Sequence, residues 1–178
     1  MTASDDLLRR IEQESSFATA LAWPGDFDVE RRDCIEELAL PTRIPLHPIA
    51  GCSAGGTYYL CGEAGAEERP VLYADSEDQA TLIGADLVEA ITLIVVLPFW
   101  RDLAKGFAIS ELGSDLRADH PDFDAERDRL LHALGLASMT LNIYTHLWPD
   151  SEERTRAAVD KAYADQSADA QPPVDEAA

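Results

Sequence analysis

The stretch that decides the fold runs from residue 55 to residue 107 and reads GGTYYLCGEAGAEERPVLYADSEDQATLIGADLVEAITLIVVLPFWRDLAKGF. Three short segments in it, 57–61, 70–74 and 81–83, are rich in β-branched, aromatic and aliphatic residues and predict β-strands. The acidic turn 75–78 joins the second strand to the third. Parallel crossovers need about a dozen residues or more, so these short connections predict an antiparallel meander.

A helix is expected directly after the last of these strands. Asp86 is suited to cap it, and nearly every position from Ile91 to Leu97 is apolar, so the helix should lie across the sheet as its central packing partner. Pro98 lacks an amide donor and should stop or kink the helix, after which 99–103 continues as another turn. Gly106 should end that piece.

The residues before this block predict two helices and a lead-in to the sheet. Ser4 can cap a helix over about 5–20, and Asp28 can cap a second, shorter helix that Pro41 stops. From Arg43 to Ile49 the apolar residues alternate, but the prolines among them limit this segment to an edge strand or an extended lead-in.

The residues after the block predict a helical extension. Pro121 can open a helix, a second apolar run covers 136–148, and a last helix should run from Asp150 to about Ala164. Residues 165–178 should form a disordered acidic tail. We therefore expect one α+β domain over 1–164, in which an antiparallel sheet of about four strands packs against helices, with a helical C-terminal extension.

The charge of the chain limits what it can bind. Of its 178 residues, 34 are acidic and 14 basic, giving a formal net charge of −20, and only four of the acids lie in the tail. This excess repels phosphate backbones and anionic lipid headgroups, so we expect no direct nucleic-acid or membrane binding. It serves either solubility or the attraction of a basic partner. The sparse, odd set of three cysteines and the polar N-terminal segment favour a cytoplasmic protein.

No motif for catalysis, cofactor binding or metal binding is found, so the sequence predicts no such residues and no cofactor. Three alternatives have some support. A zinc site has only three loosely spaced candidate ligands, whereas structural zinc sites usually have four. The two cysteines among these candidates could instead form a cross-strand disulfide. A small hydrolase would need one of the histidines of the C-terminal part. The zinc candidates are His47, Cys52 and Cys61, the disulfide would join Cys52 to Cys61, and the histidines are His120, His132 and His146.

Two groups of residues are candidates for a partner-binding surface. Aromatic anchors rimmed by charge are typical of interface hot spots, and an acidic turn can meet a basic protein. Of two neighbouring tyrosines on one strand only one can face outward, and Tyr58 is the predicted one, with Tyr59 inside. The opposing interpretation is that Phe99 and Trp100 fill the core, that the next two residues pair locally or cap, and that the acidic turn is ordinary turn chemistry. The candidates are Tyr58, Asp75, Glu77, Asp78, Trp100, Arg101 and Asp102.

The order of these elements resembles the SUKH superfamily, which includes SMI1/KNR4-type proteins, over roughly residues 20–107. The matching stretches are 54–60, 70–75, Asp86-Leu87 at the start of the apolar helix, and 97–102. The resemblance implies a small, non-catalytic α+β protein-binding module. It most often implies an immunity protein that neutralises a secreted toxin, commonly a nuclease, by binding it.

A competing hypothesis is an intracellular regulatory or scaffold protein that recruits a host factor. Its motivation is the helical extension beyond the resembling residues, which could act as the docking element. The oligomeric state is left open by the sequence.

Overall fold

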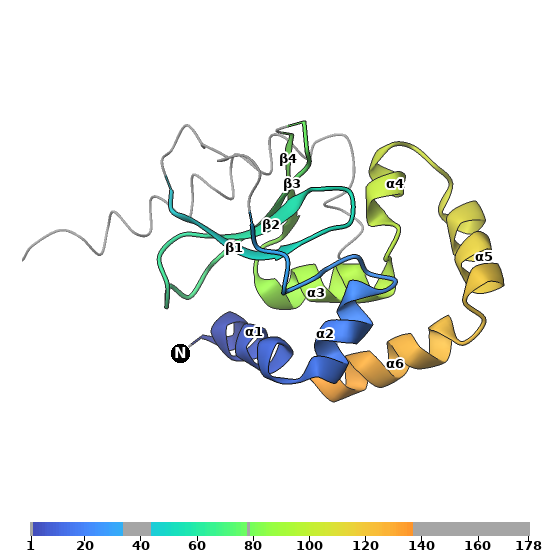
Figure 1. Cartoon of the computed structure of the whole chain (residues 1–178), viewed down its shortest axis with the longest axis horizontal. Helices are drawn as coiled ribbons and strands as arrows, with labels where there is room; N and C mark the ends of the chain where they lie inside the picture. Colours follow the sequence, from blue (N-terminus) through green and yellow to red (C-terminus); the bar gives the residue numbers. More distant parts are fainter. Residues whose placement is uncertain (1, 34–43, 78, 137–178) are drawn as a thin grey trace, which may run out of the picture.

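A computed structural model describes residues 2–33, 44–77 and 79–136 of the chain and confirms an α+β architecture (Figure 1). Asp78, the second predicted helix beyond residue 33, the helix over 150–164, the acidic tail and the apolar run after Leu136 lie outside the described residues. In chain order the elements are α1 (Ala3–Gln13), α2 (Ser15–Ala22), β1 (Leu46–Gly51), β2 (Thr57–Cys61), β3 (Val71–Ala74), β4 (Ala80–Gly84), α3 (Leu87–Val96), α4 (Trp100–Ala104), α5 (Ile109–Asp119) and α6 (Phe123–Leu134).

The four strands form one antiparallel sheet in the order β1-β2-β3-β4, so the predicted meander is confirmed. Thr57 pairs with Gly51 on one side and with Ala74 on the other, which places the β1–β2 and β3–β4 turns at the same end of the sheet. The edge position predicted for the first strand is correct, although the strand begins later and ends later than 43–49. Its ladder shifts register between Pro48 and Ala50, where a proline is tolerated because it need not donate to the ladder.

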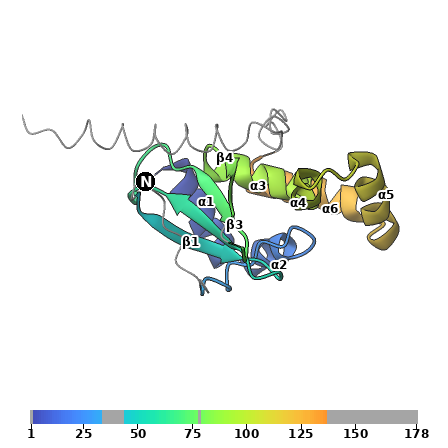
Figure 2. The ribbon, with the colours of Figure 1, turned by 90° about the horizontal axis from the view of Figure 1, so that it is seen from above.

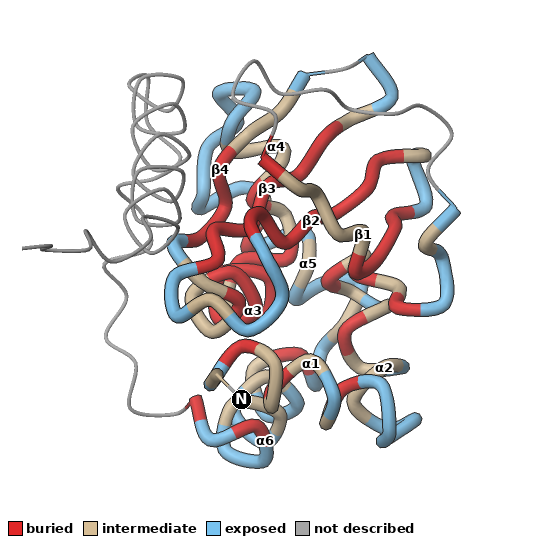
Figure 3. Tube along the Cα trace, turned by 90° about the vertical axis from the view of Figure 1, so that its left-hand side faces the viewer, coloured by how far each residue is buried: buried red, intermediate tan, exposed pale blue. Residues whose placement is uncertain are grey.

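Helix α3 packs on one face of the sheet, as predicted, and its middle is buried on all sides (Figure 2; red in Figure 3). The main core cluster joins this helix to the inward side chains of the strands and to α1, α2 and α6. The other sheet face carries a second, smaller cluster. It consists of Ile44, Cys61, Leu72 and Leu82, with Leu46 packed against it. Strands β2 and β3 are therefore buried on both faces.

The single helix expected over 5–20 is in fact two helices, α1 and α2, separated at Glu14, whose backbone is extended. The cap of α1 is Thr2 rather than Ser4. Thr2 and Asp5 form a capping box in which each side chain accepts from the other's backbone N–H. Ser4 is instead buried, and its hydroxyl oxygen accepts the backbone N–H of Leu87 at 3.3 Å.

The helix expected from Asp28 is absent from 28–33, the part of it that the structure describes. Asp28 exchanges two backbone hydrogen bonds of 2.9 Å with Gly51 in an isolated bridge. Its carboxylate accepts the N–H of Glu30 at 3.0 Å. The capping chemistry of Asp28 thus serves a turn that holds this segment against the end of β1.

Pro98 ends α3, and α4 follows as a short separate turn, in agreement with the sequence. Helix α5 was not predicted. Its N-cap, Ala108, makes no side-chain cap, and among its own residues only Gly113 is buried. Figures 1 and 2 both place α5 at the periphery, far from β1. Its apolar residues Ile109, Leu112 and Leu116 do have helical spacing, but no capping residue marks the start of the helix.

Helix α6 ends in the left-handed Gly135 and lies beside α1. The Arg10 guanidinium donates to the carbonyls of Ala133 at 2.8 Å and Leu134 at 3.3 Å, which α6 leaves without partners inside the helix. A cation at this position also meets the negative end of the helix dipole. Arg10 therefore joins the two ends of the described chain. No helix within the described ranges has both the length and the apolar content to span a membrane.

The Asp86 cap supports a direct stability prediction. Asp86 Oδ1 accepts the N–H of Glu89 at 2.8 Å, so Asp86→Ala leaves an amide of the first turn without its partner. We expect the free energy of unfolding to fall by about 1 kcal/mol. Urea titration of the variant measures this, with Asp86→Asn as the matched control because asparagine also caps. Equal losses for the two variants would contradict a capping role.

Candidate protein-interaction surface

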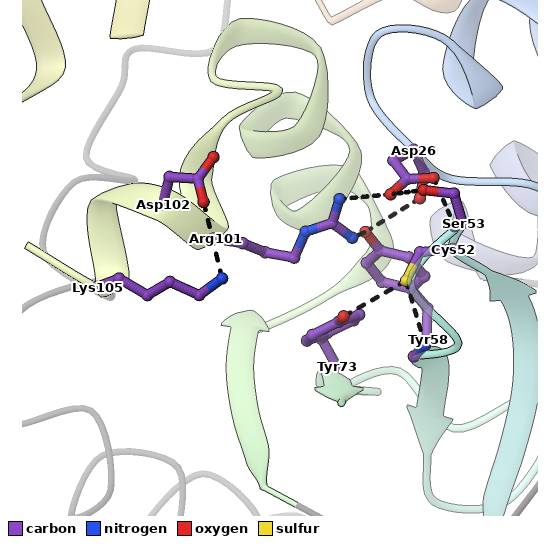
Figure 4. A network of polar contacts seen from close by, with 9 residues as sticks. Asp26, Cys52, Ser53, Tyr58, Tyr73, Arg101, Asp102 and Lys105 are labelled. Atoms are coloured by element: carbon purple, nitrogen blue, oxygen red, sulfur yellow. Dashed lines mark hydrogen bonds and ion pairs between the residues drawn. The ribbon is translucent and has the colours of Figure 1, made fainter. Parts of the chain in front are cut away.

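Arg101 links α4 to two distant parts of the chain (Figure 4). Its guanidinium contacts Asp26 Oδ2 at 2.5 Å and donates to the Tyr58 hydroxyl oxygen at 3.4 Å. Tyr58 in turn donates to the backbone carbonyl of Asp26 at 3.3 Å. The Asp26 carboxylate also accepts hydrogen bonds from the backbone N–H of Ser53 at 2.8 Å and from the Ser53 hydroxyl at 3.0 Å. We call Asp26, Ser53, Tyr58 and Arg101 the Arg101 network.

The electrostatics of the network favour its charged form. Burial disfavours the charge on Asp26, but the Ser53 N–H and the Arg101 guanidinium outweigh it and lower the pKa of that carboxyl. Burial likewise opposes the charge on Arg101, yet Tyr58 and Asp26 raise its pKa. Asp26 also has a backbone φ of 53°, in the left-handed region that aspartate tolerates better than most residues. The network thus secures an otherwise unfavourable turn.

Aromatic rings form the floor under Arg101. Tyr73 lies edge-on to Trp100 with centroids 5.2 Å apart, and Tyr58 lies 5.0 Å from both Tyr73 and Phe27. The guanidinium carbon of Arg101 sits 5.5 Å from the centre of the Tyr73 ring and 5.9 Å from that of Trp100, within cation–π range. The side chain of Arg101 is 23% exposed, so its charge lies at the boundary between this floor and the solvent.

The predicted exposure of Tyr58 is wrong. Tyr58 is fully buried and Tyr59 is 4% exposed. Their strand, β2, is covered on both faces, so the alternation of side chains no longer places either of them in solvent. Burial also raises the pKa of the Tyr58 hydroxyl well above its ordinary range. Trp100 is 2% exposed and belongs to the core, as the opposing interpretation held, and Phe99 packs against that core. Neither Tyr58 nor Trp100 can serve as an exposed anchor.

The opposing interpretation that Arg101 and Asp102 pair locally or cap is wrong for Arg101 and correct for Asp102. Arg101 pairs with Asp26, which lies 75 residues away, while Asp102 faces Lys105 at 3.8 Å on the exposed side of α4. A pair between such distant residues cannot be inferred from local spacing.

In the acidic turn, Asp75 and Glu77 have different roles. The Asp75 carboxylate accepts the backbone N–H groups of Glu77 at 2.9 Å and of Gln79 at 3.0 Å, so Asp75 holds the turn together. Glu77 is exposed. Glu77 therefore remains available to a partner, whereas Asp75 is a structural residue of the turn.

The fold brings most of the candidate residues to one end of the sheet. The β1–β2 turn carries Ser53, the β3–β4 turn carries Asp75 and Glu77, and α4 is tied to the first of these turns through Asp26. We call the two turns and α4 the turn end of the sheet. The surface it exposes is acidic and polar at the β3–β4 turn.

Each lysine and arginine of the described ranges has a partner inside the chain. Arg10 binds carbonyl groups, and the remaining basic side chains all form ion pairs. Acidic side chains, by contrast, occupy exposed loops and helix faces, among them Glu63, Glu67 and Glu77. The paired bases are Arg9, Arg31, Arg32, Arg69, Arg101, Lys105, Arg117, Arg127 and Arg129. The charge left to face solvent is therefore predominantly negative.

The other chemistries considered from the sequence gain little from the geometry. Cys52 and Cys61 are free thiols, so the cross-strand disulfide is absent. The Cys52 sulfur lies 3.4 Å from the Tyr73 hydroxyl, and burial raises the pKa of Cys61 to about 12. The described part of the chain contains no group of three or more potential metal ligands. His120 contacts Glu126 at 2.6 Å, while His146 lies outside the described residues.

Sequence reasoning missed three residues of this region: Asp26, Ser53 and Trp23. Asp26 and Ser53 lie in turns whose composition signals only a turn. Trp23 is 67% exposed and precedes Pro24 and Gly25. Its exposure has no signature in a single sequence.

Comparisons with protein-family models, curated proteins and solved structures found no match for this chain.

Proposed function

We propose that this chain is a non-catalytic protein-binding module, an immunity protein of SMI1/KNR4 type that neutralises a toxin by binding it. The observation that carries the proposal is the distribution of charge. Each described lysine and arginine is paired with a group of the same chain, so a partner meets the acidic excess of a chain with a net charge of −20. The resemblance of residues 20–107 to the SUKH superfamily supports the same class.

The partner that suits this surface is a basic protein, such as a nuclease toxin. Nucleases carry positive surface to bind phosphate, and an acidic inhibitor is attracted to that surface at long range. Complementary charge mainly accelerates encounter and fixes the register of the complex. Inhibition would then follow from occlusion of the toxin's substrate site.

Within this proposal the turn end of the sheet supplies the acidic contact. Glu77 is exposed, and Asp78 follows it in sequence. Asp75 should be left intact in any test because its carboxylate caps the turn. A matched control exists at the opposite end of the sheet, where the β2–β3 loop exposes Glu63 and Glu67.

The double variant Glu77→Lys/Asp78→Lys should slow association with the basic partner about tenfold at low salt, and the difference should shrink at high salt because screening removes steering. The control Glu63→Lys/Glu67→Lys changes the net charge equally and should slow association about twofold or less. Stopped-flow binding at two salt concentrations measures both. Equal slowing by the two variants would show that net charge, and not the turn end, governs encounter.

The partner itself is obtained by affinity capture on the full chain from its native lysate, with low-salt and then high-salt washes and identification by mass spectrometry. Recovery of a single basic nuclease that loses activity when bound supports the immunity function. Recovery of host regulatory proteins with no toxin among them supports the scaffold alternative. The peripheral helix α5, which buries only Gly113, favours that alternative as a second candidate.

A further inference from the structure

A small groove lies between the turn after α2, the C-terminal half of α3 and the part of α6 from Phe123 to Leu130. Its volume is about 60 Å³. Its walls are mostly apolar, with one acid and one base at the rim. The residues that matter most for its shape are Leu21, Trp23, Gly25, Ile94, Phe123 and Leu130. A space of this size accepts part of one aliphatic side chain.

Trp23 is the unusual member of the lining. It is 67% exposed, whereas Trp100 in the core is 2% exposed. Tryptophan buries a large apolar area when it is covered, and it is among the residues most enriched in interface hot spots. An exposed indole beside an apolar groove is therefore positioned to gain more from a partner than any other described side chain.

The wall that carries Trp23 is held in place by the fold. A Cβ at Gly25 would lie 2.7 Å from Ile94 Cγ2 and 2.8 Å from the Leu21 carbonyl oxygen, so the turn is pressed directly against α3. The Phe27 N–H donates to the Leu21 carbonyl at 3.0 Å, and the Asp26–Arg101 pair holds the far side of the turn. A preformed groove requires little ordering on binding, which favours affinity.

The charges at the rim select the occupant. Arg127 at the rim is neutralised by Asp124 at 2.7 Å and Asp128 at 2.8 Å and stacks on Phe123. Glu126, also at the rim, contacts His120, and its nearest arginine nitrogen is 3.9 Å away. The base at the rim is thus saturated, while the acid can still accept a closer cation. A basic residue beside the apolar anchor fits this arrangement.

We infer that this groove, the Trp23 groove, is the anchor site of the partner and receives an aliphatic side chain flanked by lysine or arginine. The inference rests on the proposed protein-binding function and specifies where its apolar contact lies. The acidic turn end steers the encounter, and the Trp23 groove holds the complex. Mutations at the two places should accordingly act on different rate constants.

The test uses the full chain and a short peptide, Ac-Lys-Lys-Leu-Lys-Lys-NH2, followed by the indole N–H signal of Trp23 in a ¹H–¹⁵N spectrum. We expect a saturable shift with an affinity of about millimolar. Replacing the peptide's leucine by alanine should weaken binding at least about tenfold, because burial of the leucine side chain is lost. Exchanging its lysines for glutamates should abolish binding at low salt.

Trp23→Ala should remove the peptide response of the Leu130 amide, and Phe107→Ala, which truncates a 58% exposed aromatic elsewhere, should leave it unchanged. Equal binding of the leucine and alanine peptides would overturn the inference by showing a purely electrostatic contact. An indole of Trp23 that is shielded from acrylamide quenching without any peptide would overturn it in favour of an intramolecular occupant.

If Trp23→Ala does not speed dissociation from a toxin that the wild type captures, the groove is wrong while the proposed function stands. If no toxin is captured but the peptides bind as expected, the groove stands and the immunity function fails.

Discussion

Trp100→Ala should lower the free energy of unfolding by about 3–5 kcal/mol, the loss typical of truncating a large buried aromatic side chain. Trp100 is 2% exposed and makes the edge contact with Tyr73 that supports Arg101. A domain of this size has about 5–15 kcal/mol of stability in total, so the variant should be marginal at 37 °C. Urea unfolding followed by circular dichroism at 15 °C measures the loss.

Trp100→Phe is the informative companion variant. The indole Nε1 of Trp100 is buried and has no hydrogen-bond partner among the described residues, so phenylalanine removes a polar group that contributes no bond. We expect a loss of less than about 2 kcal/mol for this change. If Trp100→Phe lowered the free energy of unfolding as much as Trp100→Ala, the indole N–H would have to donate a hydrogen bond, and the packing explanation would be wrong.

Arg101→Ala should cost about 2–3 kcal/mol at pH 7. It leaves the Asp26 carboxylate without its cation and removes the contacts with Tyr58 and Tyr73. Breaking a fully buried pair costs about 3–5 kcal/mol, and the two partners here retain 23% and 19% side-chain exposure, so we expect a smaller value. Lys105→Ala is the matched control. It breaks an exposed 3.8 Å pair on the same helix and should change stability by less than about 0.5 kcal/mol.

The effect of Arg101→Ala should depend on pH in a defined direction. Asp26 has a folded-state pKa below its ordinary value of 3.8, with the Ser53 N–H and Arg101 outweighing the opposing effect of burial. A carboxyl with a depressed pKa contributes stability above its unfolded pKa and loses it as the pH falls through the folded pKa. The difference between wild type and variant should thus be constant from pH 7 to about pH 4.5 and shrink below pH 3.8. A difference that persists undiminished at pH 2 would assign the effect to packing alone.

Much of the fold follows from local signals in the sequence. The strand over 57–61 has the predicted bounds, both strands beside the acidic turn agree with the prediction to within one residue at each end, and Asp86 caps α3. These features depend on residue type, turn chemistry and capping, all of which act over a few residues. The antiparallel order follows from the connection lengths alone.

The errors arise where distant parts of the chain decide the outcome. Tyr58 was placed outside because alternation assumes one solvated face, and its strand has none. Arg101 was expected to pair locally, but its partner Asp26 is defined only once the fold brings the two together. Helix α5 was missed because no capping residue marks its start, although Ile109, Leu112 and Leu116 have helical spacing. Thr2 could have been identified, since Asp5 three residues later completes a capping box.

The contacts of α1 have a consequence for how the protein is made on the ribosome. Ser4 binds the start of α3, Asp5 binds Arg69, and Arg10 binds the end of α6. Helix α1 can thus complete its contacts only when roughly 120 further residues have been synthesised, which takes about 6 to 24 s at about 5–20 residues per second. Until α2 and α3 have been synthesised, Leu7 and Ile11, both buried in the finished fold, lack the helices against which α1 packs. The nascent chain therefore exposes the apolar side of the amphipathic helix α1 to chaperones until α3 has formed, and the last contact, between Arg10 and α6, is made later still.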